Sequence, residues 1–145
     1  MKMLESRKVR KILNASLWGA QVLMAAVFGM AGAMKAFTPI AELAEKLPWV
    51  TEVSESLVRF IGISELIGAL GLLIPPFIHM LPWFLTPLAS LGLTIIMVLA
   101  AGFHGMRGEM SALPVNLILG LILLFISYGR FFKVPLYPQV NKYLK

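Results

Sequence analysis

The sequence predicts an all-α integral membrane protein, a four-helix bundle with a short interfacial helix after the first span. Three observations lead to this prediction. Of the 145 residues 59% are hydrophobic and only 14% are charged. The apolar residues form four stretches, at about residues 14–37, 57–74, 85–103 and 113–131, close to the about 20 residues that cross a bilayer core as a helix. The period-two alternation of a membrane β-strand is absent. We expect residues 1–145 to form one membrane domain.

The first stretch follows a basic segment, and this order fits two interpretations. It is either a retained transmembrane helix or a cleavable signal peptide, because the small residues Ala31, Gly32 and Ala33 form an acceptable cleavage pattern. The apolar run from Ile12 to Ala33 is longer than the about 7–15 residues of a signal-peptide core. We therefore expect the first helix to remain in the protein.

The connection after the first span contains a short helix. Thr38 is placed to cap it, and Pro39 fits the first helical position. The apolar residues that follow share one side of this helix: Ile40, Leu43, Ala44 and Leu47. We expect the helix to lie on the outer membrane surface, and Ser54 or Ser56 to cap the second span.

Prolines mark the boundary between the second and third spans. Pro75 and Pro76 end the second span. The third span begins in one of two ways: Thr86 and Pro87 repeat the cap-and-proline pattern, or the helix starts at Pro82 and Pro87 kinks it. The fourth span, residues 113–131, follows a short connection.

The positions of Lys and Arg predict the orientation. Basic residues flank both ends of the chain: Lys2, Arg7, Lys8, Arg10 and Lys11 before the first span, and Arg130, Lys133, Lys142 and Lys145 at or after the end of the fourth. With an even number of spans both termini share one side, which we expect to be the cytoplasm. We therefore interpret the net charge of +6 as a topology signal and as an attraction to anionic lipid headgroups. No nucleic-acid partner is expected.

Each span carries one polar residue that a bilayer disfavours: Lys35, Glu65, His104 and Asn116. If the spans alternate in direction, all four lie in the half of the membrane nearer the first and third connections. We therefore expect one buried polar site there. A charged side chain at a helix centre costs about 2.5–3.5 kcal/mol to insert, so Glu65 should be protonated or paired. Lys35 is its nearest candidate partner, and Arg59 is the second.

Small residues on the face of Glu65 predict that it points into the bundle: Gly62, Gly68 and Ala69. Gln21 shares a stripe with Lys35 and is expected deeper, on the floor of the site. Simpler interpretations stay open. Lys35 can extend to the membrane surface, His104 and Asn116 can be interfacial or capping residues, and Glu65 can belong to a purely structural ion pair.

The chain resembles the DoxX-like family in four segments that stand in the family's order: GMAGAMK (residues 29–35), RFIGISELIGALGLL (59–73), AAGFH (100–104) and NLILG (116–120). This resemblance implies a four-helix bundle in the bacterial inner membrane. Some relatives are membrane subunits of sulfur-oxidising, quinone-linked systems, some are partners of redox-stress proteins, and eukaryotic relatives are assembly factors for receptors. The wider superfamily also resembles thiol-based quinone reductases, whose mechanism the absence of cysteine excludes here, and sterol-isomerase-like bundles. None of these roles transfers by fold alone.

We expect a membrane protein without catalytic activity of its own, in an accessory or assembly role. Its bundle would bind a small lipophilic molecule or a partner membrane protein near the outer leaflet. Two alternatives remain: a quinone-binding subunit that works with a redox partner protein, and a proton-coupled transporter in which Glu65 changes protonation. No cofactor is expected apart from quinone, and no metal site. The residues expected to bind the ligand are Glu65, Lys35, His104, Asn116, Gln21 and Arg59.

Overall fold

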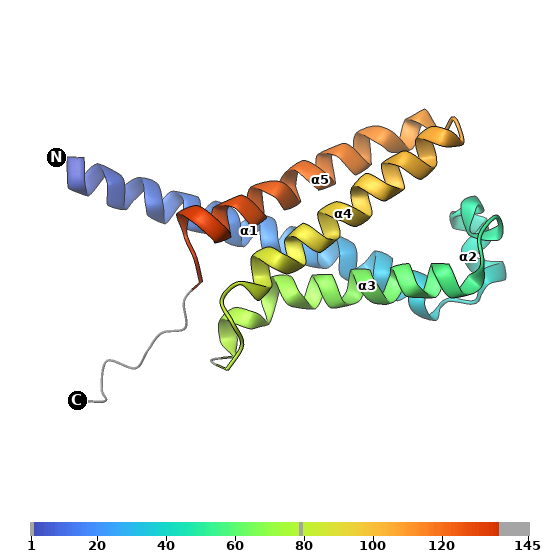
Figure 1. The fold of residues 1–145 in the computed structure, drawn as a ribbon, viewed down its shortest axis with the longest axis horizontal. Helices are drawn as coiled ribbons and strands as arrows, with labels where there is room; N and C mark the ends of the chain where they lie inside the picture. Colours follow the sequence, from blue (N-terminus) through green and yellow to red (C-terminus); the bar gives the residue numbers. More distant parts are fainter. Residues whose placement is uncertain (1, 79, 137–145) are drawn as a thin grey trace.

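The computed structural model describes residues 2–78 and 80–136 (Figure 1). The long helices are α1 (Lys2–Phe37), α3 (Glu55–Leu73), α4 (Leu85–Met106) and α5 (Leu113–Tyr128), and the short helix α2 (Ile40–Lys46) follows α1. Single turns of 3-10 or π geometry complete the chain: η1 (Pro48–Thr51), η2 (Pro75–Phe77), η3 (Met110–Ala112) and η4 (Gly129–Lys133). Within this described part, four segments are long and apolar enough to span a bilayer: Ser6–Phe37, Glu55–Leu73, Leu85–Met106 and Met110–Lys133. The predicted multi-pass membrane bundle is confirmed.

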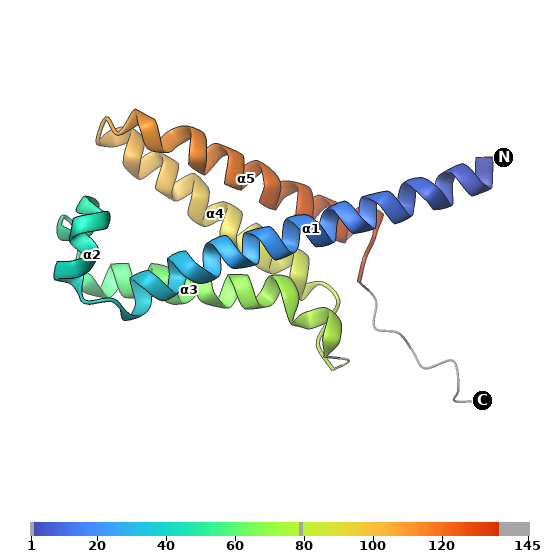
Figure 2. The ribbon, with the colours of Figure 1, turned by 180° about the vertical axis from the view of Figure 1, so that it is seen from behind.

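The long helices form two antiparallel pairs, α1 with α3 and α4 with α5. The pairs lie close together near the start of α4 and diverge toward the end of the molecule that carries α2 (Figures 1 and 2). The first turns of α1 and the π turn η4 lie at the opposite end. We call these the α2 end and the Arg130 end.

The core lies where the two pairs meet. Side chains from all four spans pack there: Met24 and Phe28 of α1, Ala69 and Leu72 of α3, Leu93 and Met97 of α4, and Leu123 and Ile126 of α5. A second, smaller cluster lies at the α2 end and contains Leu43, Val50 and Val58. The outward faces of the spans remain apolar, which suits contact with lipid tails.

The ends of the first two spans are set by hydrogen bonds to side chains. Helix α1 is longer than predicted and begins at Lys2 rather than near residue 14, because Lys and Arg are good helix formers. It ends at Phe37, where Arg59 donates from Nη1 to the carbonyl oxygens of Lys35 (2.8 Å) and Thr38 (2.6 Å). Ser54 caps α3 by accepting a hydrogen bond from the backbone N–H of Leu57, so one of the two predicted caps is confirmed.

Two other predicted helix caps are wrong, although α4 begins where the third span was predicted to begin, at about residue 85. Helix α2 begins at Ile40, with Pro39 rather than Thr38 at the N-cap and no side-chain cap. Thr38 belongs instead to the last turn of α1, because its backbone N–H donates to the carbonyl oxygen of Met34. Helix α4 begins at Leu85, so Pro87 lies in the first turn, where an N–H group has no intrahelical partner to lose.

The last two spans extend beyond their predicted ends. Helix α4 continues to Met106, and the fourth span continues beyond α5 as the π turn η4, to Lys133. A π turn inserts an extra residue into each turn and changes the direction of the side chains. In this protein it places Arg130 in the interior.

Candidate functional site

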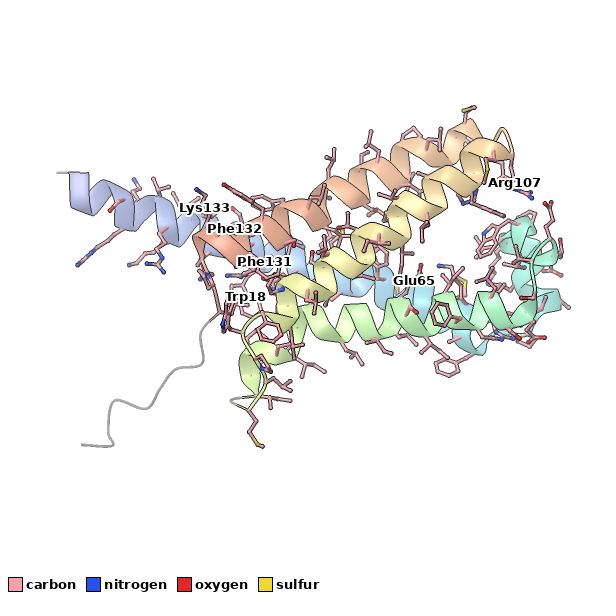
Figure 3. The ribbon with its side chains drawn as sticks, in the orientation of Figure 1. Trp18, Glu65, Arg107, Phe131, Phe132 and Lys133 are labelled. Atoms are coloured by element: carbon pink, nitrogen blue, oxygen red, sulfur yellow. The ribbon has the colours of Figure 1, made fainter. Side chains whose placement is uncertain are left out.

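Lys35 and Glu65 form a buried ion pair near the α2 end. Lys35 Nζ donates to both carboxylate oxygens of Glu65, at 2.7 Å to Oε1 and 2.6 Å to Oε2. The side chains are 12% and 3% exposed. Figure 3 shows Glu65 on α3, on the side that faces the gap between the helix pairs. The predicted partner of Glu65 is confirmed, and Lys35 does not extend away to the surface.

Glycines on both helices allow this pair to form. A Cβ atom at Gly62 would lie 2.6 Å from the backbone N of Ala36 and 2.8 Å from the carbonyl oxygen of Gly32. A Cβ atom at Gly32 would lie 2.7 Å from the carbonyl oxygen of Gly62. Only residues without a side chain permit backbones to approach this closely. The crossing therefore brings Lys35 on α1 within direct reach of Glu65 on α3.

A cavity of about 550 Å³ lies beside the ion pair. All four polar residues that the sequence places at one depth line it: Lys35, Glu65, His104 and Asn116. The rest of the wall is mainly apolar and comes from α1, α3, α4 and the segment after α2, with Met34, Trp49, Ile61, Met97, Ala100 and Phe103 among its residues. Two further wall residues, Phe60 and Leu99, are themselves each 67% exposed. The cavity therefore borders the lipid-facing surface where α3 and α4 diverge.

Among the described residues, neither His104 nor Asn116 forms a hydrogen bond with the Lys35–Glu65 pair. His104 Nδ1 donates to Glu109 Oε2 at 2.5 Å, which leaves Nε2 facing no partner among the described residues. Asn116 Nδ2 is buried and, within the described part of the chain, also has no hydrogen-bond partner. Glu109 lies only five residues after His104, and the hydrogen bond between them directs the imidazole toward the turn after α4.

Gln21 and Arg59 lie outside the wall of the cavity, contrary to the expectation that they share the site. Gln21 is fully buried and donates to the carbonyl oxygen of Leu72 at 2.6 Å. Arg59 pairs with Glu55 one helical turn earlier, at 2.9 Å, besides holding the end of α1. Both side chains form hydrogen bonds that hold α1 and α3 together.

Ion pairs connect the segment after α2 to the turn between α4 and α5 at the α2 end. Arg107 pairs with Glu52 beside η1 and with Glu109 in its own loop. Trp49 of η1 packs edge-on against Phe103 of α4, with ring centroids 5.9 Å apart. Figure 3 shows Arg107 at the turn between α4 and α5, at the same end as α2. We call this set of contacts the Arg107 latch. It holds the segment that covers the cavity against the second helix pair.

Charge-assisted hydrogen bonds perturb one carboxyl group of the latch. Hydrogen bonds from Arg107, and secondly from His104, hold the pKa of Glu109 below its usual value, because they stabilise the carboxylate. Glu109 is therefore ionised near neutral pH, and its donors stay in place.

A second polar cluster, at the Arg130 end, was not predicted. Arg130 is fully buried; it donates from Nε to Gln21 Oε1 (2.6 Å) and from Nη1 to Asn14 Oδ1 (2.7 Å). Its guanidinium lies over the ring of Trp18, 5.4 Å from the centroid. The signal was an arginine inside the predicted fourth span, together with Asn14 and Gln21 two helical turns apart on the first. In the sequence, Arg130 was counted only among the basic residues that predict the cytoplasmic side.

No metal centre is evident: within residues 2–78 and 80–136, no three His, Cys, Asp or Glu side chains lie close enough together to hold an ion.

Comparison with known proteins gives one family. The family model described as the DoxX-like family matches residues 19–126, which include all four polar residues of the cavity but neither Asn14 nor Arg130. No curated protein and no solved structure matches the chain.

Proposed function

This chain belongs to the DoxX-like family, and from that premise we propose that its bundle binds an uncharged amphipathic molecule drawn from the bilayer. The apolar body of the ligand fills the cavity between the helix pairs. Its polar head, a hydroxyl or carbonyl group, meets Asn116, His104 and the Lys35–Glu65 pair. With this ligand bound, the protein acts as an accessory membrane protein.

The cavity itself is the observation that supports this proposal. Its about 550 Å³ falls within the about 300–1,000 Å³ of small-molecule sites, which are apolar with a few convergent polar groups. The four polar residues come from α1, α3, α4 and α5, and they line one cavity although 81 positions separate Lys35 from Asn116 in the sequence. Burying several polar side chains at membrane depth costs free energy, and such residues usually serve a binding or transport function.

Electrostatics favour an uncharged ligand. Lys35 and Glu65 neutralise each other, since both carboxylate oxygens accept from the same ammonium group. A charged head would leave one net charge in a largely apolar cavity, which costs several kcal/mol. The unpaired donor on Asn116 instead suits a neutral oxygen acceptor, because a buried N–H without a partner costs about 1–3 kcal/mol.

The position of the cavity supports access from the membrane. Phe60 of α3 and Leu99 of α4 stand on its wall and are also exposed to lipid. From the positive-inside pattern we infer that this end lies in the outer leaflet. A lipophile in that leaflet reaches the cavity between α3 and α4 without crossing water.

Filling the cavity tests the proposal. Ala100→Trp places a large ring in the cavity wall, and Ala26→Trp makes the same change on an exposed face of α1. We expect native mass spectrometry of protein released from its own membranes to find a retained lipophile in wild type and Ala26→Trp, and to find it lost in Ala100→Trp. An empty wild type, or equal retention in all three proteins, contradicts the proposal.

A quinone-binding role is the second candidate, favoured by one observation. The free Asn116 Nδ2 can donate to a quinone carbonyl, and Trp49 in the cavity wall reports occupancy. Titration with a short-chain ubiquinone is expected to quench the emission of wild type more strongly than that of Asn116→Leu. Equal quenching in the two proteins counts against a quinone.

A further inference from the structure

We propose a second binding site at the Arg130 end, for the phosphate group of an anionic phospholipid. The site is a basic hollow of about 660 Å³ between the start of α1 and the segment after η4. Its wall residues are Arg7, Lys8, Arg10, Lys11, Asn14 and Val134. The hollow shares no residue with the cavity at the α2 end, so the two proposals are independent.

The cations of the hollow are gathered on one side of a helix. Arg7, Arg10, Lys11 and Asn14 follow one another at spacings of three, one and three residues, which places them on one face of α1. Like charges at these spacings repel each other. Among the side chains that the structure describes, residues 6–78 and 80–136, no carboxylate pairs with any of these cations. Within residues 6–78 and 80–136, the face therefore has no paired counter-charge.

The buried guanidinium of Arg130 does not itself line this hollow, but it hydrogen bonds to two residues that do. Its Nη1 donates to Asn14 Oδ1 at 2.7 Å and to the carbonyl oxygen of Val134 at 3.2 Å, and both acceptor residues line the hollow. Its Nη2 is buried and has no hydrogen-bond partner in the described part of the chain. Its described contacts are to neutral groups, Asn14, Gln21, Val134 and the ring of Trp18. A buried, fully charged guanidinium with a spare donor is a group that an anion would stabilise.

The surroundings indicate that the anion belongs to a lipid. The basic residues lie in the first turns of the spanning segment Ser6–Phe37. Trp18 lies at the same end (Figure 3), and tryptophan is enriched in the headgroup region of membranes. A phosphodiester at headgroup depth meets the cations of the hollow, whose wall residues Asn14 and Val134 are held by the guanidinium of Arg130. Basic residues here attract anionic lipids.

The test removes two charges from the hollow without touching Arg130, whose loss would disturb the bundle. The variant is Arg10→Gln/Lys11→Gln, and the control Lys46→Gln/Thr51→Glu makes the same change in net charge at exposed positions of the α2 end. Native mass spectrometry measures retention of phosphatidylglycerol against phosphatidylcholine by the full chain in detergent. We expect wild type and control to prefer phosphatidylglycerol, and the hollow variant to lose about tenfold or more of that preference.

Three results overturn the proposal. The first is equal retention of the two lipids by wild type, and the second is an equal loss of preference in the control, which reports net charge alone. The third concerns the source of the phosphate. Inorganic phosphate, titrated calorimetrically into delipidated protein, is expected to bind far more weakly than the lipid, because it lacks acyl chains. Binding as tight as that of phosphatidylglycerol would assign the hollow to a soluble anion.

Discussion

At the scale of single residues, the bundle depends on where each buried charge finds its partner. Glu65 and Lys35 satisfy each other at 2.6 Å, whereas Arg130 is surrounded by neutral acceptors and an aromatic ring. The two arrangements have different consequences. A buried ion pair can be replaced by two apolar residues with little loss of stability. A buried cation without a counter-charge is stabilised only by the neutral polar groups around it.

The ion pair predicts a strongly non-additive mutant cycle. Lys35→Met alone leaves Glu65 buried without a partner, and we expect it to lower the free energy of unfolding by about 3–5 kcal/mol. Lys35→Met/Glu65→Leu removes both charges and is expected to recover most of that loss. Reversible unfolding in mixed micelles measures the four stabilities of the cycle, with Glu65→Leu as the second single variant. Additive losses, with the double variant the least stable, would contradict the pairing.

At the scale of helices, the close crossing of α1 and α3 decides whether the ion pair can form. Gly32 and Gly62 lie at this contact, and any side chain there meets backbone atoms of the facing helix. Backbone cannot move aside as a flexible side chain can. The crossing is therefore specified by glycine more than by hydrophobicity.

Gly62→Ala tests the crossing. Its Cβ would lie 2.6 Å from backbone N of Ala36, so the helices must separate, and we expect a loss of about 1–3 kcal/mol of stability. The control is Gly92→Ala on α4, where no heavy atom lies within 4 Å of the added Cβ. That change should be neutral or stabilising by up to about 1 kcal/mol, because Ala favours helix over Gly. Similar losses in both variants would place the effect in helix propensity or insertion rather than in the crossing.

The Arg107 latch predicts a pH dependence at acid pH. Glu109 has a lowered pKa in the folded protein. Its ion pairs are therefore complete above its usual pKa of 4.5, and they are lost as the pH falls through the lowered value. We expect the emission of Trp49, which packs on Phe103 beside the latch, to change in this acid range. The change should be smaller in Glu109→Gln, which cannot titrate at that position. Identical pH profiles in the wild type and Glu109→Gln would show that the titration of Glu109 does not cause the change.

At the scale of the whole molecule, two helix pairs diverge from a shared core, so the two ends differ (Figures 1 and 2). The α2 end is open between the pairs and holds a cavity beside a neutral ion pair. The Arg130 end holds a basic hollow. A bilayer has a corresponding asymmetry, because anionic lipids concentrate in the cytoplasmic leaflet.

The charge distribution predicts which end faces the cytoplasm, and single cysteines test it without background because the chain has none. Thr51 in η1 and Met80 between α3 and α4 are both exposed. A membrane-impermeant maleimide added to intact cells is expected to label Thr51→Cys. Met80→Cys should react only after the membrane is permeabilised. The reverse pattern would invert the protein and move the cavity to the inner leaflet.

The sequence alone determined the number of spans and the membrane environment, and it made Lys35 the first of two candidate partners of Glu65. These depend on composition and on helical spacing, which are local properties that lipid enforces because each span must satisfy its own backbone. It also placed the four polar residues of the cavity at one depth. Their role as a ligand site stays a prediction.

Only the tertiary structure decided which contacts these residues make. Periodicity gives the face of a helix but neither the angle at which helix pairs diverge nor the path of a loop. The capture of His104 by Glu109, the separation of Gln21 from the cavity and the burial of Arg130 all follow from that angle and those paths. The cavity has the same origin, since it is the space left where two tightly crossed pairs separate.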